Sequence, residues 1–257
     1  RTTPVVRHGL ATVIQVVGDP TGRLTPLAQQ MLGSFAVGIL DITVATQDPE
    51  PTPFLQMDES YRLRVTAKGV ELSSPGYWGA LHGIATLNQL ALHNQLYPGL
   101  LIQDKPRFAW RGLLLDVARH FFPVAALKSV IDGLAALKMN VLHLHLSDDQ
   151  GFRFPSAAFP NLASDDHYTA KELRELVTYA ADRAVRIVPE LDMPGHVTSW
   201  LVSHPEWGTQ KTAASRRFGV HKACLNPLDE AVYQAIEVLL GEVAGIFPDE
   251  YLHVGGD

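Results

Sequence analysis

The first 105 positions change their hydrophobic and polar pattern over short distances. The segments ATVIQVV and YRLRVTAKGVELSS are short, rich in β-branched residues and partly alternating, which predicts strands. The segments TPLAQQMLGSFAVGIL and GYWGALHGIATLNQLALHNQ repeat apolar residues at helical spacing, which predicts helices. We therefore expect a small α+β domain over residues 1–105.

The pattern changes after Pro106, so we expect a second domain over residues 106–257. Strand-like apolar segments now alternate with long helical ones. The predicted strands are WRGLLLDVA, NVLHLHLSDD, RIVPELD and YLHVGGD, and the predicted helices are PVAALKSVIDGLAALKM, TAKELRELVTYAADRAV and NPLDEAVYQAIEVLLGEVAGIF. Thr169 with Glu172 forms a capping box, and Asn226 is the expected N-cap of the last helix.

Near-continuous apolar strands separated by helices indicate a parallel sheet covered by helices. Two folds fit this pattern, a doubly wound sheet and a (β/α)8 barrel. A barrel closes with eight strands, and residues 106–257 supply four predicted ones. On the barrel interpretation, this part of the chain is an incomplete barrel.

Composition excludes several classes of protein. The formal net charge is −6, and the longest basic run is Arg216–Arg217, so we expect no nucleic-acid partner. Unbroken apolar stretches stay shorter than the roughly 18 to 20 residues of a membrane helix, so we expect no membrane partner. The single cysteine, Cys224, excludes an internal disulfide and a cysteine-based zinc site.

Polar side chains follow the carboxyl end of every predicted strand in the second domain. They are Asp116 with Arg119 and His120, then Ser147 to Asp149, then Glu190, Asp192 and His196, and finally His253 and Asp257. The carboxyl ends of parallel strands meet at one edge of the sheet, where active sites of such folds lie. Four strands that end in this way predict a functional site.

Individual residues of this set allow more than one interpretation. His143 and His145 lie two apart on one strand face, which is metal-ligand spacing, but packing inside a barrel layer is equally open to them. Asp148 and Asp149 point to opposite sides of a strand, so at most one of them faces a substrate. Glu242 lies in an apolar helix, where a solvated position is the simplest interpretation.

Four motifs together resemble glycoside hydrolase family 20, the β-N-acetylhexosaminidases. They are WRGLLLDVARHFFP, KMNVLHLHLSDDQGFR, PELDMPGH and YLHVGGD, in the order and spacing of the family, and the likeness runs from Gly76 to Asp257. The front part resembles the small α+β domain that precedes the barrel in this family. The resemblance implies an α/β fold in which that domain is followed by the first half of a (β/α)8 TIM barrel.

The resemblance also implies a reaction. These enzymes are retaining exo-glycosidases that remove terminal β-linked GlcNAc or GalNAc without an enzyme nucleophile. The 2-acetamido oxygen of the substrate attacks the anomeric carbon and forms an oxazolinium ion, while an Asp orients the acetamide and a neighbouring Glu serves as acid and base. Asp257 matches the Asp, and the Glu would be the next residue. A glycan is then the expected partner, and neither a cofactor nor a metal is expected.

Further roles follow from the resemblance alone. Arg119 matches the arginine that binds hydroxyls of the terminal sugar. Asp148, Asp192, His196 and Glu242 match polar residues that surround the acid and raise its pKa. On this interpretation His143 and His145 are not metal ligands.

The chain ends between the two carboxylates that the family motif places side by side. We therefore expect it to be the amino-terminal half to two-thirds of a secreted or periplasmic enzyme, inactive without the rest of the barrel. Two alternatives stay open: a metal-dependent barrel hydrolase, and a non-catalytic sugar-binding fragment.

Overall fold

The structure is a computed structural model that describes residues 12–19, 21–33, 35, 37–45 and 52–257. The chain divides into two compact units. Unit 1 takes residues 1–111 with 133–140 and 181–184, and unit 2 takes 112–132, 141–180 and 185–257. The domain limits expected from the sequence, 1–105 and 106–257, stay a prediction.

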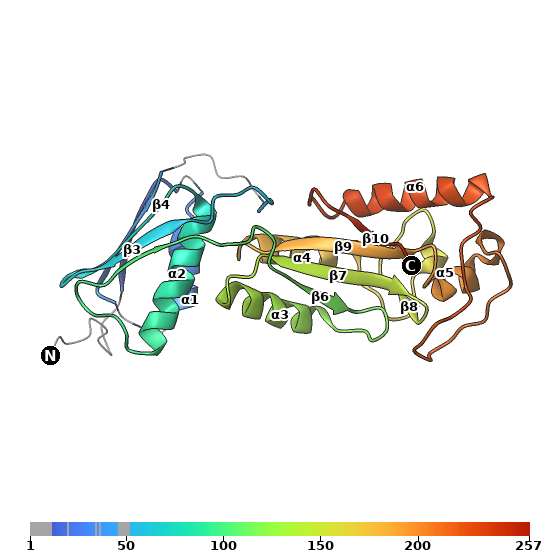
Figure 1. Ribbon diagram of the computed structural model, residues 1–257, viewed down its shortest axis with the longest axis horizontal. Helices are drawn as coiled ribbons and strands as arrows, with labels where there is room; N and C mark the ends of the chain where they lie inside the picture. Colours follow the sequence, from blue (N-terminus) through green and yellow to red (C-terminus); the bar gives the residue numbers. More distant parts are fainter. Residues whose placement is uncertain (1–11, 20, 34, 36, 46–51) are drawn as a thin grey trace. The chain divides into compact units, whose positions relative to one another are not determined.

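Unit 1 is built on a five-stranded sheet of order β1-β2-β4-β3-β5. Its strands are β1 (Val13–Val17), β2 (Ile39–Val44), β3 (Tyr61–Val65), β4 (Gly69–Ser74) and β5 (Leu101–Asp104), and its helices are α1 (Leu24–Leu32) and α2 (Tyr77–Leu92). Strands β1, β2 and β4 are parallel, whereas β3 runs antiparallel to both β4 and β5. Figure 1 shows α1 and α2 beside this sheet.

One predicted helix of unit 1 is wrong in its second half. The pattern of residues 25–40 predicts one helix, but α1 ends at Leu32, and Ile39 already begins strand β2. Gly33 follows α1 with φ +56° and donates its N–H to the carbonyl of Gln29. A glycine adopts this left-handed backbone without a steric penalty, which ends the helix.

The core of unit 1 lies between the sheet and its helices. Alternate residues of β2 are fully buried, as Leu40 and Ile42 show, and α2 is buried along most of its length. Two glycines one turn apart bring α2 close to the strands. A Cβ at Gly79 would overlap the carbonyl of Ser60, and one at Gly83 would overlap the side chain of Leu72.

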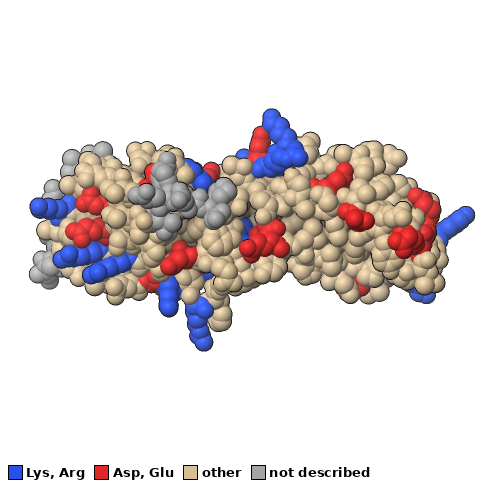
Figure 2. Space-filling view, turned by 90° about the horizontal axis from the view of Figure 1, so that it is seen from above, with Lys and Arg blue, Asp and Glu red and all other residues tan. Residues whose placement is uncertain are grey.

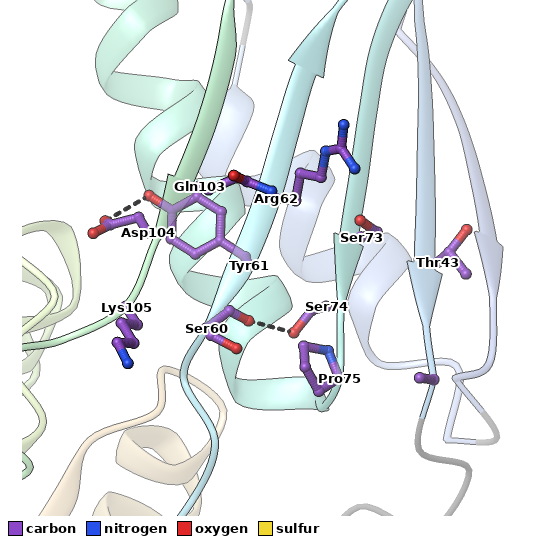
Figure 3. A pocket seen from close by; sticks show the side chains of 11 residues that line it. Thr43, Ser60, Tyr61, Arg62, Ser73, Ser74, Pro75, Gln103, Asp104 and Lys105 are labelled. Carbon is purple, nitrogen blue, oxygen red and sulfur yellow. Dashed lines mark hydrogen bonds between the residues drawn. The ribbon is translucent and has the colours of Figure 1, made fainter.

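The sheet of unit 1 also carries an open hollow (Figure 3). Its volume is about 630 Å³. Exposed side chains of β2, β3, β4 and the edge strand β5 line it, among them Thr43, Arg62, Ser73 and Gln103. These positions alternate with the buried ones, as expected for a sheet with one covered face.

A buried ion network lies in unit 1 around Glu59. Arg111 donates to both oxygens of this carboxylate, at 2.5 and 3.0 Å, and Nε2 of His82 lies 2.7 Å from Oε1. The side chains of Glu59 and His82 are each 4% exposed. Burial tends to raise the pKa of Glu59, but the hydrogen bonds with His82 and Arg111 outweigh it and leave the pKa lowered.

We expect Glu59→Gln to destabilise the full-length protein that contains this chain by about 3 kcal/mol, because Arg111 would keep its charge and lose its counterion. Thermal or denaturant unfolding measures this loss. Because the pKa of Glu59 is lowered in the folded protein, its contribution to the free energy of unfolding is present above pH 4.5 and is lost as the pH falls below that value. The stability of the variant should therefore approach that of wild type in acid. Exposed Glu71→Gln is the control, expected within about 0.5 kcal/mol of wild type. An equal loss in both variants would contradict the role of this network.

Unit 2 holds the second sheet, of order β10-β9-β7-β6 with β8 paired to β7. The strands are β6 (Gly112–Asp116), β7 (Val141–Asp148), β8 (Gly151–Phe152), β9 (Arg186–Met193) and β10 (His253–Gly255). The helices between them are α3 (Val124–Ala136), α4 (Ala170–Ala181), α5 (Thr198–Ser203) and α6 (Glu230–Ala244), with short 3₁₀ turns at Pro160–Leu162 and Pro205–Trp207.

The strand order decides between the two folds that the sequence left open. Strands β6, β7, β9 and β10 are all parallel, and each pairs with the next one along the chain. A doubly wound sheet reverses its strand order at a switch point, whereas a barrel continues in one direction. These strands therefore have the order of a barrel segment.

Helix caps in unit 2 agree with the sequence in one case and differ in another. Thr169 and Glu172 exchange the hydrogen bonds of a capping box before α4, as predicted. Helix α6 begins later than expected, because Asp229 is its N-cap and accepts a hydrogen bond from the N–H of Ala231. Asn226 lies in the preceding turn and accepts from the N–H of Leu228.

Among the residues that the structure describes, no helix is both long and apolar enough to span a membrane.

Candidate active site

The polar residues predicted at the strand ends form one connected cluster in unit 2. We call it the carboxylate–histidine cluster, and its members are Asp116, Arg119, His143, His145, Asp148, Glu190, Asp192, His196, His253 and Asp257. Strand register brings part of it into one layer, because Asp116 pairs with His145, and both His145 and His253 pair with Glu190. Paired residues of parallel strands point to the same face, so their side chains meet.

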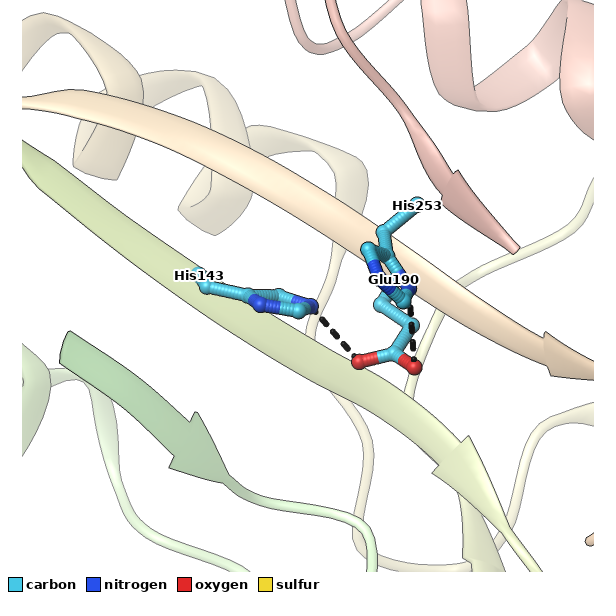
Figure 4. Close-up of side chains that lie close together, drawn as sticks. All are labelled: His143, Glu190 and His253. Atoms are coloured by element: carbon cyan, nitrogen blue, oxygen red, sulfur yellow. Dashed lines mark hydrogen bonds and ion pairs between the residues drawn. The ribbon is translucent and has the colours of Figure 1, made fainter. Parts of the chain in front are cut away.

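Glu190 is the centre of the histidine layer (Figure 4). Its Oε2 lies 2.7 Å from Nε2 of His143 and 2.9 Å from Nδ1 of His145, and its Oε1 lies 3.2 Å from Nδ1 of His253. Burial alone would raise the pKa of Glu190, but hydrogen bonds from His143 and His145 hold it well below its usual range. Glu190 therefore carries a negative charge that orients three imidazoles.

The donor atoms of His143, Glu190 and His253 all lie within 4.8 Å of one another, a spacing that a metal ion could bridge. In this structure the same atoms bond one another directly. The arrangement of His143 and His145 is therefore that of histidines packed within a barrel layer, the second of the two interpretations that the sequence allowed.

Asp148 joins the deepest part of the cluster to its surface. Its buried Oδ2 lies 2.9 Å from both Nη2 of Arg119 and Nε2 of His145, and its Oδ1 lies 3.1 Å from Nδ1 of His196. Burial tends to raise the pKa of Asp148, and the bonds from His145, the Asp149 N–H and His196 more than reverse this, so the pKa is lowered. Burial would lower the pKa of His145, but its bonds to Asp148 and Glu190 raise it well above its usual value. Asp148 is therefore ionised and held from three sides.

Arg119 is fixed by two carboxylates. Asp116 accepts from the Arg119 backbone N–H at 2.9 Å and from Nη1 at 2.8 Å, while Nη2 contacts Asp148. The side chain is 36% exposed, so part of its guanidinium edge faces outward. Its remaining N–H groups are available to a ligand in one orientation.

Asp192 has an environment opposite to that of Asp148. It is 4% exposed, and its Oδ1 has no hydrogen-bond partner in the part of the chain that the structure describes. Burial, followed by the charges of Asp257 and Glu190, raises the pKa of Asp192 to about 6. A carboxyl with this pKa exchanges its proton close to neutral pH.

The strand end around Asp257 is held by backbone contacts. The Gly195 N–H donates to the Asp257 carbonyl at 2.9 Å, and the Gly256 N–H donates to the Met193 carbonyl at 3.0 Å. The Asp257 carboxylate is 76% exposed and lies 3.4 Å from Nε2 of His196. Burial lowers the pKa of His196, but the bond to Asp148 and the charges of Asp148, Asp192 and Asp257 leave it raised. The raised pKa favours the protonated imidazole of His196, which lies between Asp148 and Asp257.

Asp149 follows β7 and divides its contacts between α5 and the cluster. Its Oδ1 accepts from both the backbone N–H and the hydroxyl of Thr198, at the start of α5. Its Oδ2 lies 3.6 Å from Nδ1 of His196, which is farther than the 3.1 Å between that nitrogen and Oδ1 of Asp148. Asp149 therefore holds a helix start at the border of the cluster, and Asp148 makes the closer contacts within it.

The structure does not bring Glu242 to the cluster. Its carboxylate accepts from the hydroxyl of Ser156 at 2.5 Å and from the N–H groups of Ala157 and Ala158 at 3.0 and 2.9 Å. These contacts tie α6 to the loop of Ser156. A role of Glu242 in raising the pKa of the acid stays a prediction, and none of these contacts supports it.

Sequence reasoning listed Asp116, Glu190 and His253 among the strand-end residues without a role for each, and it left His145 open between a metal ligand and a packed histidine. One signal was present, because Glu190 lies two residues before Asp192 on the same strand and so on the same face. What was missing was the register between strands, which the sequence does not contain.

The chain is similar to known glycosidases. The family model for the glycosyl hydrolase family 20 catalytic domain matches residues 108–257, and a model described as β-acetyl hexosaminidase like matches residues 29–90. The chain therefore belongs to glycosyl hydrolase family 20.

Curated relatives agree with this assignment. The chain is 37% identical to the β-hexosaminidase subunit beta of Entamoeba histolytica over 216 residues, which are 78% of this chain and 38% of that protein. It is also 37% identical to a β-hexosaminidase of Akkermansia muciniphila over 242 residues, covering 84% of this chain and 48% of that protein. The chain spans less than half the length of these two relatives.

Solved structures show the same fold. A chitobiase of Flavobacterium johnsoniae matches with a TM-score of 0.86 and 35% identity, over 100% of this chain and 42% of that one. A mutant Streptomyces plicatus β-hexosaminidase in complex with the product GlcNAc matches with a TM-score of 0.84 and 30% identity, over 99% of this chain and 56% of that one. These neighbours confirm the expected fold class, a small α+β domain followed by the first half of a (β/α)8 TIM barrel.

Gly255 lies beside Asp192 and constrains it. Gly255 has φ +70°, and a Cβ there would overlap Oδ1 of Asp192. We expect Gly255→Ala to displace this carboxyl and to destabilise the protein by about 2 kcal/mol, which thermal or denaturant unfolding measures. Gly241→Ala, where a Cβ meets nothing within 4 Å, is the matched control and should be at least as stable as wild type. Equal stability of the two variants would contradict a constrained Asp192.

The raised pKa of Asp192 makes the stability of the protein depend on pH. The folded pKa of Asp192 is about 6 and its ordinary value is 3.8, so its contribution is favourable below pH 3.8 and is lost as the pH rises through 6. We expect Asp192→Asn to gain up to about 3 kcal/mol relative to wild type between pH 4 and pH 7. Unfolding of both full-length proteins at several pH values measures the difference. Exposed Asp41→Asn should show a constant difference, and a constant difference for Asp192→Asn as well would contradict the raised pKa.

Proposed function

We propose that this chain is the amino-terminal part of a retaining exo-β-N-acetylhexosaminidase that removes terminal β-linked GlcNAc or GalNAc. The observation that carries the proposal is the position of the Asp257 carboxylate, exposed at the strand ends and 3.4 Å from Nε2 of His196. Membership of glycosyl hydrolase family 20 and the GlcNAc bound by the Streptomyces plicatus relative support it.

The proposed reaction uses the substrate as its own nucleophile. The 2-acetamido oxygen attacks the anomeric carbon as the bond to the leaving oxygen breaks, and an acid donates a proton to that oxygen. The resulting oxazolinium ion is opened by water, whose proton returns to the same group. Asp257 accepts a hydrogen bond from the acetamide N–H and stabilises the positive charge that develops on the ring.

The cluster supports the position of Asp257. Nε2 of His196 lies 3.4 Å from the Asp257 carboxylate, and Asp148 at 3.1 Å holds the imidazole from its other side. Asp148 is held in turn by His145 and Arg119, which bond to it. The surroundings of Asp257 thus depend on a chain of contacts that ends in the histidine layer.

Arg119 is the proposed ligand for the hydroxyls of the terminal sugar. Its guanidinium is held by Asp116 and Asp148, so the outward N–H groups are fixed before a sugar binds. Fixed donors reduce the entropy that binding costs, and they favour one sugar orientation over others. This orientation would place the acetamide toward Asp257.

We further propose that residues outside this chain complete the barrel and supply the acid and base. The outer strands β6 and β10 carry exposed apolar side chains, with Leu114 51% and Val254 42% exposed. Further strands would cover these residues and close the sugar pocket. The chain alone is then inactive, and a secreted or periplasmic location would suit a glycan substrate.

The test measures how the rate of hydrolysis by the full-length protein depends on the nucleophilicity of the substrate's acetamide oxygen. We expect hydrolysis of 4-nitrophenyl N-acetyl-β-D-glucosaminide, with kcat/KM falling at least about tenfold along the series of mono-, di- and trifluoroacetyl substrates. Each fluorine withdraws electrons from the amide oxygen and weakens it as a nucleophile. Asp257→Asn should lower kcat about 100-fold or more, because the charge is lost where it is needed.

Two results would contradict this proposal. Rates that stay flat along the fluorinated series would exclude participation of the acetamide. Activity that a chelator abolishes and zinc restores would favour the metal-dependent hydrolase instead. Glu237→Gln, an exposed change on α6, is the matched charge control for Asp257→Asn and should leave all rates unchanged.

A further inference from the structure

The segments that lead into β6 and β7 are joined by Asn140. Asn140 is fully buried and precedes Val141, the first residue of β7. Its N–H donates to the Arg111 carbonyl at 2.9 Å, and its Oδ1 accepts from the Arg111 N–H at 2.9 Å. Its Nδ2 donates to the Ala109 carbonyl at 2.8 Å. We call Arg111 and Asn140, with these contacts, the register clamp.

The register clamp fits one alignment of the two strands. The next residues along the chain, Gly112 and Val141, form the first pair of the β6–β7 ladder. A slip by one residue would place another residue opposite Asn140. A fully buried amide would then lose the groups that it bonds, which is unfavourable. The clamp therefore selects the observed register.

Arg111 is itself held from several sides within unit 1. Figure 2 shows charged side chains dispersed over one face of the molecule, whereas the Glu59 carboxylate that binds Arg111 is only 4% exposed. Glu59 accepts from both Nη atoms of Arg111, at 3.0 and 2.5 Å. The Phe108 carbonyl accepts from Nη1 at 2.7 Å, and the Lys138 carbonyl accepts from Nε at 2.9 Å. Because Gly112 follows Arg111 in the chain, these contacts of unit 1 also fix the point where β6 begins.

Strand β6 is held at both ends. The register clamp lies at its amino end, and beyond its carboxyl end Arg153 donates to the Val117 and Ala118 carbonyls at 3.0 and 2.8 Å. Among the described residues β6 pairs with β7 alone, in a register that brings Asp116 opposite His145. The clamp and Asp116 are about 17 Å apart along the strand, at roughly 3.3 Å per residue. Without the clamp β6 would be held at one end, so we expect its alignment with β7 to loosen as far as Asp116.

Asp116 converts the position of β6 into the orientation of Arg119. Its carboxylate accepts from the Arg119 backbone N–H at 2.9 Å and from Nη1 at 2.8 Å. Nη2 of Arg119 lies 2.9 Å from Oδ2 of Asp148, which is on β7. One guanidinium is thus held by carboxylates of two strands. A shift of Asp116 relative to Asp148 would therefore turn it.

We propose that Asn140 is a positioning residue for Arg119, and that Glu59 acts in the same way through Arg111. This inference rests on the proposed function, in which Arg119 binds hydroxyls of the terminal sugar. A displacement of about 1 Å caused far from the reacting atoms can lower a rate about 100-fold. A loosened register thus costs activity although every group that touches the substrate is still present. Unit 1 then contributes to substrate binding through the strand that follows it.

The experiment is a double-mutant cycle on the full-length protein, with 4-nitrophenyl N-acetyl-β-D-glucosaminide as substrate. We expect Asn140→Ala to lower kcat/KM about tenfold and Glu59→Gln about threefold, at a temperature where circular dichroism shows each variant folded. Both changes are then repeated in an Arg119→Ala protein. There each should alter kcat/KM less than about twofold, because the side chain that they position is absent.

A variant that loses stability elsewhere separates positioning from folding. Leu176→Ala removes a fully buried side chain of α4 and should lower the melting temperature at least as much as Asn140→Ala. We expect kcat/KM of the folded Leu176→Ala protein within about twofold of wild type.

Four results would decide against this inference. No hydrolysis by the wild-type protein would overturn the proposed function and this inference with it. Hydrolysis with an unchanged kcat/KM in Asn140→Ala would overturn this inference alone. So would an equal loss from Asn140→Ala with and without Arg119, or a loss as large in Leu176→Ala. If Asn140→Ala does not fold, the Glu59→Gln cycle decides by the same criteria.

Discussion

The site depends on one buried carboxylate, Asp148. Its two oxygens contact Arg119, His145 and His196, which come from three different strand ends. A carboxylate without exposed surface needs such partners, since an unpaired buried charge costs several kcal/mol. The same bonds that compensate the charge of Asp148 also orient each of its three partners. The positions of Arg119 and of the histidine beside Asp257 are therefore set by the same group.

The same edge of the sheet holds carboxyls with opposite tendencies. Hydrogen bonds hold the pKa of Glu190 and of Asp148 below their usual values, although burial acts against this. Asp192 has no such donor at Oδ1, and its pKa is raised to about 6. Parallel strands place all three within one small volume, and local donors decide which of them stays charged. This separation of proton affinities is typical of sites that transfer protons.

The sequence by itself determined the class of fold and most of the strand ends that carry chemistry. Apolar runs separated by helices indicate parallel β/α structure, and Asp148, Asp192, His196, Arg119 and Asp257 all lie at the edge where strand order predicts them. These features are local, since periodicity and turn chemistry act over a few residues.

Only the tertiary structure decided which residues meet. Strand register places Glu190 and His145 side by side in the site. Glu242 lies outside the site, because its carboxylate binds the hydroxyl of Ser156. The segment from Ile39, predicted as the second half of a helix, is strand β2 because it pairs with β4 farther along the chain. Register, side-chain direction and long-range pairing arise from contacts between distant segments, and a single sequence read along its length does not contain them.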